Sequence, residues 1–417
     1  MRDLLLGREP SDYDIATDAT PDKVTELFPE SIAVGAQFGV ILVPRDGMKV
    51  EVATFRSDVS YTDGRRPDAV IYAKSAEEDV HRRDFTINGL LMRHDTAEVL
   101  DFVGGRDDLK AGIVRAIGNA DKRIEEDKLR MLRGVRFAAR FGFEIEAATF
   151  RSIRKHAENI HQVSAERVRD ELTKMLTEGA AGNAFRLLDQ TWLLRMVLPE
   201  IAAMKGVEQP PQYHPEGDVW VHTSMMLDGI AGGSTPTFAW GVLLHDVGKP
   251  PTFRSAKETG DRIRFDGHAE VGVRMGAEIC KRLKMSGDDT DQILALIANH
   301  MKFKDASQMR ASTLKKFVRM ANFAEHMALH KLDCLSSHRK LETYEFVRDF
   351  VARTPPEEVR PPRLLTGDDL LYLGFQPGPK FKEVLQAIED GQLEGQIQTR
   401  EDALRLAERA YRGKHPR

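Results

Sequence analysis

Two aspartates near the start of the chain have the spacing of a metal site. Asp12 and Asp14 lie between a turn-like segment, residues 9–11, and the apolar Ile15. Side chains two positions apart on a strand project from the same face, so these carboxylates would lie close together. Like charges repel unless a cation lies between them, and hard oxygen ligands suit Mg²⁺. Such ions can activate an attacking hydroxyl and stabilise a leaving pyrophosphate, although Asp-x-Asp also occurs in ordinary surface turns.

A third carboxylate lies on a later run with strand-like alternation. Glu51 stands between Val50 and Val52. If this run pairs beside the first one, Glu51 faces the same site, and the alternative is a solvated strand residue. We therefore take Asp12, Asp14 and Glu51 as candidate catalytic residues, with the two aspartates as the Mg²⁺ ligands.

Arginines recur in two further segments. Arg82 and Arg83 precede an apolar stretch, and Asp127, Arg130 and Arg133 follow one another at three-residue steps, which predicts one shared helix face. An aspartate can accept from the exocyclic amine of cytosine or adenine while an arginine donates to the adjacent ring nitrogen, and further arginines can hold a triphosphate. The alternative is surface pairing worth a few tenths of a kcal/mol.

Histidines and aspartates recur between helical stretches in the second half of the chain. The candidate metal ligands are His222, His245, Asp246, His268, His300 and Asp333. Imidazole and carboxylate groups suit a transition metal, Mg²⁺ or Mn²⁺ with open positions for a phosphate and a water. Cys280 and Cys334 lack the paired spacing of a zinc site, and we expect both in the core.

The elements that must position these groups change character along the chain. The first 118 residues mix strand-like runs, at 13–16, 39–43 and 49–55, with a short helix over 21–28, which predicts an α/β or α+β region. From about residue 121 the pattern is helical, with proline-rich breaks near 209–215 and 354–362. Residues 57–68 are polar and are expected to form a long mobile loop.

Length and composition set the outer limits. A chain of 417 residues predicts two to four domains, and 41% hydrophobic with 30% charged residues is an ordinary globular composition. The net charge of −4 argues against a uniformly basic nucleic-acid binder but allows a local basic groove. Two cysteines cannot form a disulfide framework, and no apolar run or leader sequence is evident, so we expect a cytoplasmic protein without a membrane span.

Several motifs occur in a specific order. Arg2-Asp3-Leu4 is followed by Asp12-Tyr13-Asp14, and then by three further motifs, Glu51 to Arg56, Arg82 to Asn88 and Glu126-Asp127-x-x-Arg130-x-x-Arg133. In this order they resemble the bacterial class II tRNA nucleotidyltransferases, the CCA-adding enzymes, and the related poly(A) polymerases. The resemblance is strong over residues 1 to about 200.

The resemblance implies an α+β, polymerase β-like nucleotidyltransferase head with a mixed sheet, followed by an all-helical neck, an HD domain and a tail. The expected boundaries are 1–118, 119–213, 214–340 and 341–417. It also implies template-independent addition of CCA to tRNA from CTP and ATP with Mg²⁺. Asp127 and Arg130 would read the base edge, and the expected nucleotide contacts are Arg2, Arg83, Arg133 and Arg136. Residues 61–70 resemble the loop used in the switch from CTP to ATP.

The histidine and aspartate series resembles an HD-family phosphohydrolase, a domain that some CCA-adding enzymes carry after the neck. It implies a second divalent metal, of open identity, and activity on phosphomonoesters or 2′,3′-cyclic phosphates. Two alternatives remain. One is poly(A) addition, and the other is an HD phosphohydrolase with an impaired head that only binds RNA.

The resemblance departs from the family pattern at the start of the chain. The family places a strand and a Gly-Gly pair before its Arg-Asp, and here Met1 precedes Arg2 directly. A strand and turn of about ten residues are therefore expected to be missing from the head. We favour a start placed too late over an impaired enzyme, because every later motif is intact.

Overall fold

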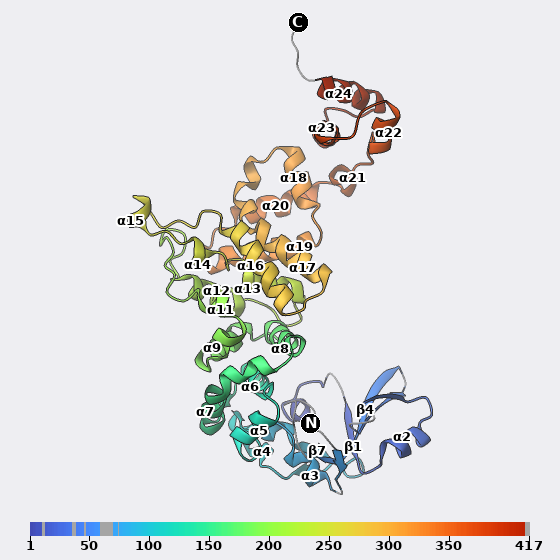
Figure 1. Cartoon of the computed structure of the whole chain (residues 1–417), viewed down its shortest axis with the longest axis vertical. Coiled ribbons are helices and arrows are strands. Elements are labelled where there is room, and N and C mark those ends of the chain that lie inside the picture. Colours follow the sequence, from blue (N-terminus) through green and yellow to red (C-terminus); the bar gives the residue numbers. More distant parts are fainter. Residues whose placement is uncertain (11–12, 36–38, 46, 59–69, 74, 413–417) are drawn as a thin grey trace. The chain divides into compact units, whose positions relative to one another are not determined.

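The computed structural model describes residues 1–10, 13–35, 39–45, 47–58, 70–73 and 75–412 (Figure 1). They group into two compact units. Unit 1 comprises Met1–Val207, Thr223–Leu243 and Glu278–Ser286, and unit 2 comprises Glu208–His222, Leu244–Ala277 and Gly287–Arg417. Three helices have residues in both units: α12 (Val219–Asp228), α13 (Pro236–Leu244) and α16 (His268–Arg282). No helix in the described ranges is both long and apolar enough to cross a membrane.

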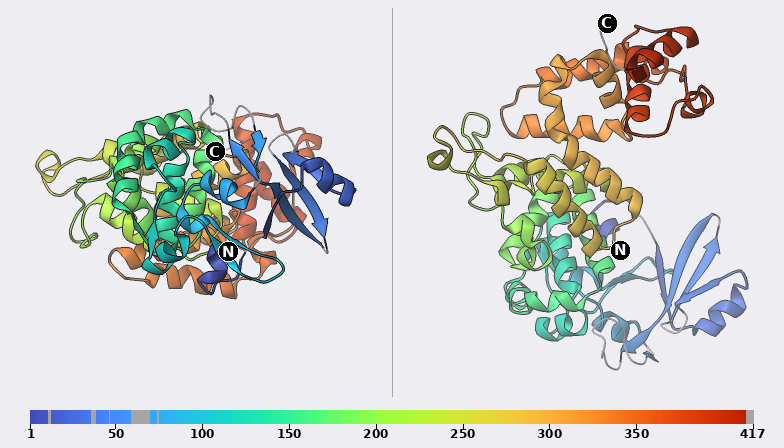
Figure 2. Two further views of the ribbon diagram at one scale, coloured as in Figure 1. Left: turned by 90° about the horizontal axis from the view of Figure 1, so that it is seen from below. Right: turned by 45° about the horizontal axis from the view of Figure 1, so that its top comes forward.

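A four-stranded mixed sheet forms the first part of unit 1, as predicted. Its order is β1–β4–β3–β2, with β1 parallel to β4 and the other neighbours antiparallel. The strands are β1 (Asp14–Thr17), β2 (Ile32–Gly35), β3 (Val40–Arg45) and β4 (Met48–Thr54). Helix α2 (Pro21–Leu27) begins with proline after Thr20 and lies beside the sheet (Figure 2). Its Val24 packs on Ile41, Val43 and Val52. This burial holds β4, the strand that carries the predicted Glu51.

Short strand pairs and helices complete the head. Strand β5 (Arg56–Asp58) pairs with β6 (Val70–Tyr72), and β7 (Leu90–Met92) pairs with β8 (Val99–Asp101). The predicted loop at 61–70 lies outside the described residues except for Val70 in β6. The helices are α1 (Arg2–Leu5), α3 (Ala76–His81), η2 (Thr86–Asn88) and α4 (Gly105–Ala111).

The chain becomes helical after a short parallel pair, β9 (Ile113–Val114) with β10 (Glu144–Ile145). The helices of this region are α5 (Ala120–Glu126), α6 (Arg130–Phe141), α7 (Ala147–His156), η3 (Ala157–Gln162), α8 (Ala165–Thr177), α9 (Ala181–Gln190), α10 (Leu193–Val197) and α11 (Pro199–Ala202). A shared core joins Phe137 and Ala138 of α6 to Phe85, Ile87 and Leu90 of the head. That core fixes the arginine motifs of head and helices against each other.

Unit 2 is helical. It contains α14 (Lys249–Thr252), α15 (Ala256–Thr259), α17 (Gly287–Asn299), η4 (His300–Gln308), α18 (Ala311–Val318), α19 (Phe323–Ser336), α20 (Glu342–Arg353), α21 (Pro356–Val359), α22 (Gly367–Tyr372), α23 (Pro379–Leu393) and α24 (Arg400–Arg412). One apolar cluster surrounds Phe303 and Phe317, and another lies between α23 and α24. Cys280 and Cys334 are both buried, as predicted, and neither forms a disulfide in the described part of the chain.

Candidate functional site

Two of the three predicted carboxylates of the head are neighbours across strands. Asp14 of β1 and Glu51 of β4 are directly paired in the parallel register, and both side chains are exposed. Adjacent strands lie about 4.8 Å apart, and paired residues project from the same face of a sheet. The donor set of carboxylate oxygens fits Mg²⁺, which also reduces their mutual repulsion. Asp12 lies outside the described residues.

Arg2 is held at the junction between the head and α6. Its guanidinium donates to the side-chain oxygen of Asn88 and pairs with Asp3 at 3.0 Å. The guanidinium carbon lies 4.7 Å from the ring centres of both Phe137 and Phe141. Burial lowers the pKa of Arg2 more than Asp3 raises it. Its position is therefore set by aromatic packing as well as by hydrogen bonds.

Arg82 and Arg83 share one buried carboxylate. Asp79 of α3 accepts from Arg82 at 2.7 Å and from Arg83 at 2.9 Å, and Arg83 also donates to the backbone oxygen of Asn88. Burial alone would raise the pKa of Asp79, but the charges of both arginines hold it below its usual value. Asp79 thus keeps two cations side by side at the end of α3.

A second buried carboxylate holds Arg133. Asp84 is 8% exposed and accepts from Arg133 Nε at 2.8 Å and from Asn88 Nδ2 at 2.9 Å. Against the effect of burial, the charge of Arg133 and the hydrogen bonds hold the pKa of Asp84 low. Arg136, one turn further on α6, is enclosed by Glu171 at 2.7 Å and Glu178 at 3.3 Å. Arg133 therefore presents a partly exposed cation, whereas Arg136 lies inside the helical packing.

The predicted base-reading pair lies at a break between two helices. Asp127 ends α5 in an extended conformation, and α6 begins at Arg130. The expectation that Asp127, Arg130 and Arg133 share one helix face is therefore wrong. The break arises because the Asp127 carboxylate accepts from the backbone N–H of Leu129 at 3.1 Å, which replaces a helical hydrogen bond.

Both members of this pair have fixed partners. Arg167 of α8 donates to the two oxygens of Asp127 at 3.1 and 2.8 Å. Arg130 donates to Glu126 at 2.7 Å and to the backbone oxygens of Arg123 and Arg82 at 2.8 and 3.0 Å.

Asp127 and Arg130 each keep hydrogen-bonding positions that these partners do not occupy. A carboxylate offers about four acceptor positions, and the Arg167 and Leu129 bonds occupy three of those on Asp127. A guanidinium offers five N–H donors, and three of those on Arg130 are occupied. An acceptor beside a donor complements the amine and ring nitrogen of cytosine or adenine. Uracil and guanine present a carbonyl and an N–H at the same positions, so an acceptor would face an acceptor and a donor would face a donor.

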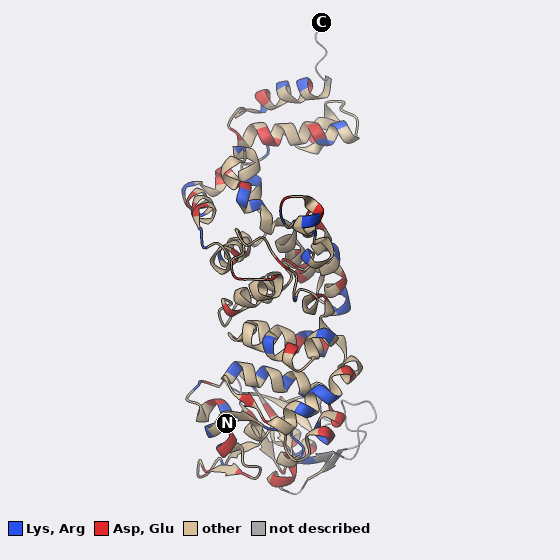
Figure 3. Cartoon of the chain, turned by 90° about the vertical axis from the view of Figure 1, so that its left-hand side faces the viewer, with Lys and Arg blue, Asp and Glu red and all other residues tan. Residues whose placement is uncertain are grey.

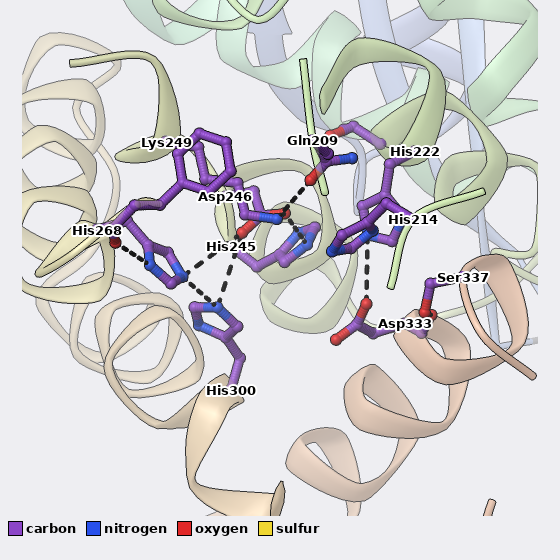
Figure 4. Close-up of polar contacts among 12 residues, drawn as sticks. Gln209, His214, His222, His245, Asp246, Lys249, His268, His300, Asp333 and Ser337 are labelled. Carbon is purple, nitrogen blue, oxygen red and sulfur yellow. Dashed lines mark hydrogen bonds and ion pairs between the residues drawn. The ribbon is translucent and has the colours of Figure 1, made fainter. Parts of the chain in front are cut away.

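Unit 2 brings all six predicted metal ligands together (Figure 4). They form two groups of three residues, and within each group the ligand atoms lie within 4.8 Å of one another. One group is His222, His245 and Asp333, and the other is Asp246, His268 and His300. His245 and Asp246 follow the end of α13 at Leu244, so the helix end directs adjacent residues into different groups. The nitrogen and oxygen donors of each group fit a divalent transition metal, Mn²⁺ or Mg²⁺.

Hydrogen bonds orient the imidazole rings of the site. Glu216 accepts from Nδ1 of His222 at 2.7 Å, which leaves Nε2 directed at Asp333, 3.2 Å away. His268 and His300 place Nδ1 at 2.9 and 2.7 Å from the backbone oxygens of Phe265 and Ile297, so their Nε2 atoms face each other at 3.2 Å. Such outer contacts fix the tautomer in which Nε2 can bind a metal.

Burial and charge shift the protonation of these groups in opposite directions. Burial lowers the pKa of His300 to about 4. Burial would also lower the pKa of His222, but hydrogen bonds to Asp333 and Glu216 raise it to about 9. The charges of His245 and Lys249 hold the pKa of Asp246 low despite its burial. Dense ionisable groups of this kind in a buried site are typical of functional centres.

Lys249 supplies a further buried cation. Its Nζ atom is 2.7 Å from both Asp246 Oδ2 and Gln209 Oε1, and the residue is 6% exposed. Sequence reasoning did not select Lys249, Gln209 or Glu216. The only sequence signal for Lys249 is its position three residues after Asp246, where it can pair with that carboxylate. Gln209 and Glu216 lie in a loop, and no sequence motif marks them.

Three family models match the chain. The poly A polymerase head domain matches residues 1–115, the probable RNA and SrmB-binding site of polymerase A matches 142–205, and the HD domain matches 223–335. The crystal structure of the Bacillus stearothermophilus CCA-adding enzyme in complex with CTP superposes with a TM-score of 0.73 at 25% identity. That superposition covers 98% of this chain and 90% of the other. The chain thus resembles the poly A polymerases in its head domain and a CCA-adding enzyme along nearly its whole length.

Curated relatives align to different extents. The CCA-adding enzyme of Leuconostoc mesenteroides is 46% identical over 187 residues, which is 45% of this chain and 46% of the relative. The Bacillus cytotoxicus enzyme is 28% identical over 407 residues, covering 97% and 91% of the two chains. At the higher identities the chain spans about half the length of the curated relatives that it matches. These matches confirm the predicted resemblance, the α+β head and the HD domain.

Proposed function

We propose that this chain adds CMP and AMP to the 3′ end of tRNA that lacks its CCA end, using CTP and ATP and releasing pyrophosphate. The observation that carries the proposal is the Asp127–Arg130 pair. Fixed partners leave it a hydrogen-bonding pattern suited to cytosine and adenine. A protein side-chain pair of this kind replaces a nucleic-acid template. The similarity to a CTP-bound CCA-adding enzyme over 98% of the chain supports the same assignment.

The residues of the head divide the work of the transfer. Asp12, Asp14 and Glu51 would hold Mg²⁺, which lowers the charge on the α-phosphate and supports attack by the tRNA 3′ hydroxyl. The triphosphate would contact Arg2, Arg83 and Arg133, with Arg136 supporting them through α6. The proposed substrate also implies a cytoplasmic enzyme, with a head at 1–118, a neck at 119–213, an HD domain at 214–340 and a tail at 341–417 that contacts tRNA.

Extension of a tRNA transcript that lacks CCA, with CTP, ATP and Mg²⁺, tests the main proposal. Asp14→Asn should abolish extension because it removes a charge opposite Glu51. The exposed Asp18→Asn, which lies beyond β1, serves as the control. Failure of extension, including by a chain extended through any in-frame upstream codons, would reject the proposal. Long A tails made from ATP alone would instead support poly(A) addition.

We also propose a metal-dependent phosphohydrolase activity for the HD domain, with phosphomonoesters or 2′,3′-cyclic phosphates as substrates. The two groups of donors support it, because two ions would activate a water and bind a phosphate together. The test is hydrolysis of p-nitrophenyl phosphate and 2′,3′-cyclic AMP with Mg²⁺, Mn²⁺ or Ni²⁺. His245→Ala should lose hydrolysis while Asp14→Asn keeps it. Hydrolysis without nucleotide transfer would favour a hydrolase with an impaired head.

A further inference from the structure

A cavity in unit 2 lies beside α23 and the proline-containing segment 360–365. Its volume is about 430 Å³, and Arg319 at the end of α18 completes its lining. Small-molecule sites have volumes of about 300–1,000 Å³, so the cavity has room for such a ligand. Leu365, Leu385 and Ile388 form its apolar wall, and all three belong to the apolar cluster between α23 and α24. The apolar wall is therefore part of a packed core.

Hydrogen bonds and prolines hold the segment 360–365 in place. The guanidinium of Arg360 donates to the backbone oxygen of Arg319, and Gln392 Nε2 of α23 donates to that of Pro362 at 2.6 Å. The rings of Pro361 and Pro362 fix their φ angles and restrict the residue that precedes each of them. The cavity is therefore bounded by backbone with little freedom, as small-molecule sites commonly are.

The charges that line the cavity are not balanced. Lys and Arg occur among Asp and Glu on the helices next to the C-terminus (Figure 3), so the ion pairs decide which cations are available. Glu389 is the one carboxylate among the described lining residues, and it already pairs with Arg319 at 2.5 Å. In the described part of the chain, the side chains of Arg363 and Lys382 have no hydrogen bond or ion pair, and that of Arg360 contacts only a backbone oxygen. Three cations therefore line the cavity without a carboxylate partner.

We propose that this cavity binds a small phosphate ester of about mononucleotide size. Its phosphate would contact Arg360, Arg363 and Lys382, and its organic part would lie on the apolar wall. Guanidinium groups donate in pairs to phosphate oxygens, and a lysine adds a compact charge. A phosphate without an organic part would leave the apolar wall in water, and a neutral ligand would leave the cations without a counter-charge.

The lining favours a free ligand over an RNA strand. A single strand is usually held by a groove of cations along its backbone and by aromatic rings that stack on its bases. Here the cations line one cavity, and none of the described lining residues is aromatic. The inference goes beyond the proposed function, because the cavity contains none of the residues assigned to nucleotide transfer or to the metal groups.

Amide hydrogen exchange of the full chain with AMP tests the proposal. EDTA in the buffer keeps divalent metals from the head and from the HD domain. AMP should slow exchange in residues 360–365 and in α23, and its dissociation constant for this protection should rise at least tenfold in Arg363→Gln/Lys382→Gln. Neither side chain has a partner within the described residues, so the melting temperature should not change. Arg348→Gln/Arg405→Gln is the matched control, since it removes the same charge from exposed ion pairs outside the cavity.

Four results would overturn the inference. One is protection of α23 that is the same in the cavity variant as in the wild type, and another is protection confined to the head. A third is equal protection by inorganic phosphate or by adenosine at the concentration used for AMP, because the ligand would then need only one of its two parts. The last is protection by tRNA lacking CCA but not by AMP, which would make the cavity an RNA contact. Nucleotide transfer is not measured, so each of these results leaves the proposed function as it stands.

Discussion

Arg167 donates two hydrogen bonds to Asp127, one to each carboxylate oxygen, at 3.1 and 2.8 Å. The two residues lie 40 positions apart, on α8 and at the end of α5. A paired guanidinium–carboxylate contact fixes the plane of the carboxylate as well as its position. The orientation of the Asp127 carboxylate is therefore set by a helix that carries none of the predicted nucleotide contacts.

Arg167→Gln should loosen Asp127 and reduce base selectivity. We expect the preference for CTP over UTP to fall about 10- to 100-fold, in line with ~1–3 kcal/mol for a well-oriented polar contact. Competing incorporation of the two nucleotides at the first added position measures the ratio. Arg169→Gln, on the same helix but paired with the exposed Asp170, should keep wild-type selectivity. Equal effects of the two substitutions would show that Asp127 does not depend on Arg167 for its orientation.

The metal ligands of the HD domain could be predicted from sequence because their types follow one another in an order that resembles an HD domain. Only His245 and Asp246 form a local pattern, an adjacent pair after an apolar helix, whereas His222 and Asp333 lie within α12 and α19. Their partner Glu216 could not be predicted, because its contact with His222 depends on how a loop folds. The role of Arg167 could not be predicted either, because its contact with Asp127 joins residues 40 positions apart. The helix break at Asp127 had a local signal, since aspartate often bonds a backbone N–H two residues later.

Glu216→Gln should weaken metal binding without removing a proposed ligand. Glu216 holds the His222 ring so that Nε2 faces the metal site, and loss of such an outer contact costs about 10- to 100-fold in affinity. Titration of the metal-free protein with Mn²⁺ or Ni²⁺ measures the dissociation constants. Glu258→Gln, an exposed residue of α15 whose side chain bonds the N-cap Ser255 in unit 2, is the control. Unchanged dissociation constants in Glu216→Gln would show that metal binding does not depend on the contact between Glu216 and His222.

Asp84→Asn should destabilise unit 1 and impair nucleotide binding together. Arg133 would lose its buried counter-charge, and breaking a buried pair from one side costs about 3 kcal/mol or more in the free energy of unfolding. Urea unfolding measures that loss, and the KM for CTP should rise because Arg133 would move. Asp95→Asn breaks an exposed pair with Arg93 and should change neither quantity measurably. A destabilised variant with an unchanged KM would show that Arg133 does not contact the nucleotide.

The HD domain should lose stability as pH falls from about 6.5 to 4. Burial lowers the pKa of His326 to about 4, whereas an unfolded histidine titrates near 6.5. The unfolded chain therefore binds a proton at a higher pH than the folded one. The stabilisation is complete above pH 6.5 and declines through this window, by roughly 3 kcal/mol.

Amide hydrogen exchange of α19, which contains His326, measures the free energy of opening at each pH. In His326→Phe the decline should be smaller, whereas the exposed His94→Phe should retain it fully. An identical decline in both variants would assign the acid sensitivity to other groups, among them His330, whose pKa burial also lowers to about 4.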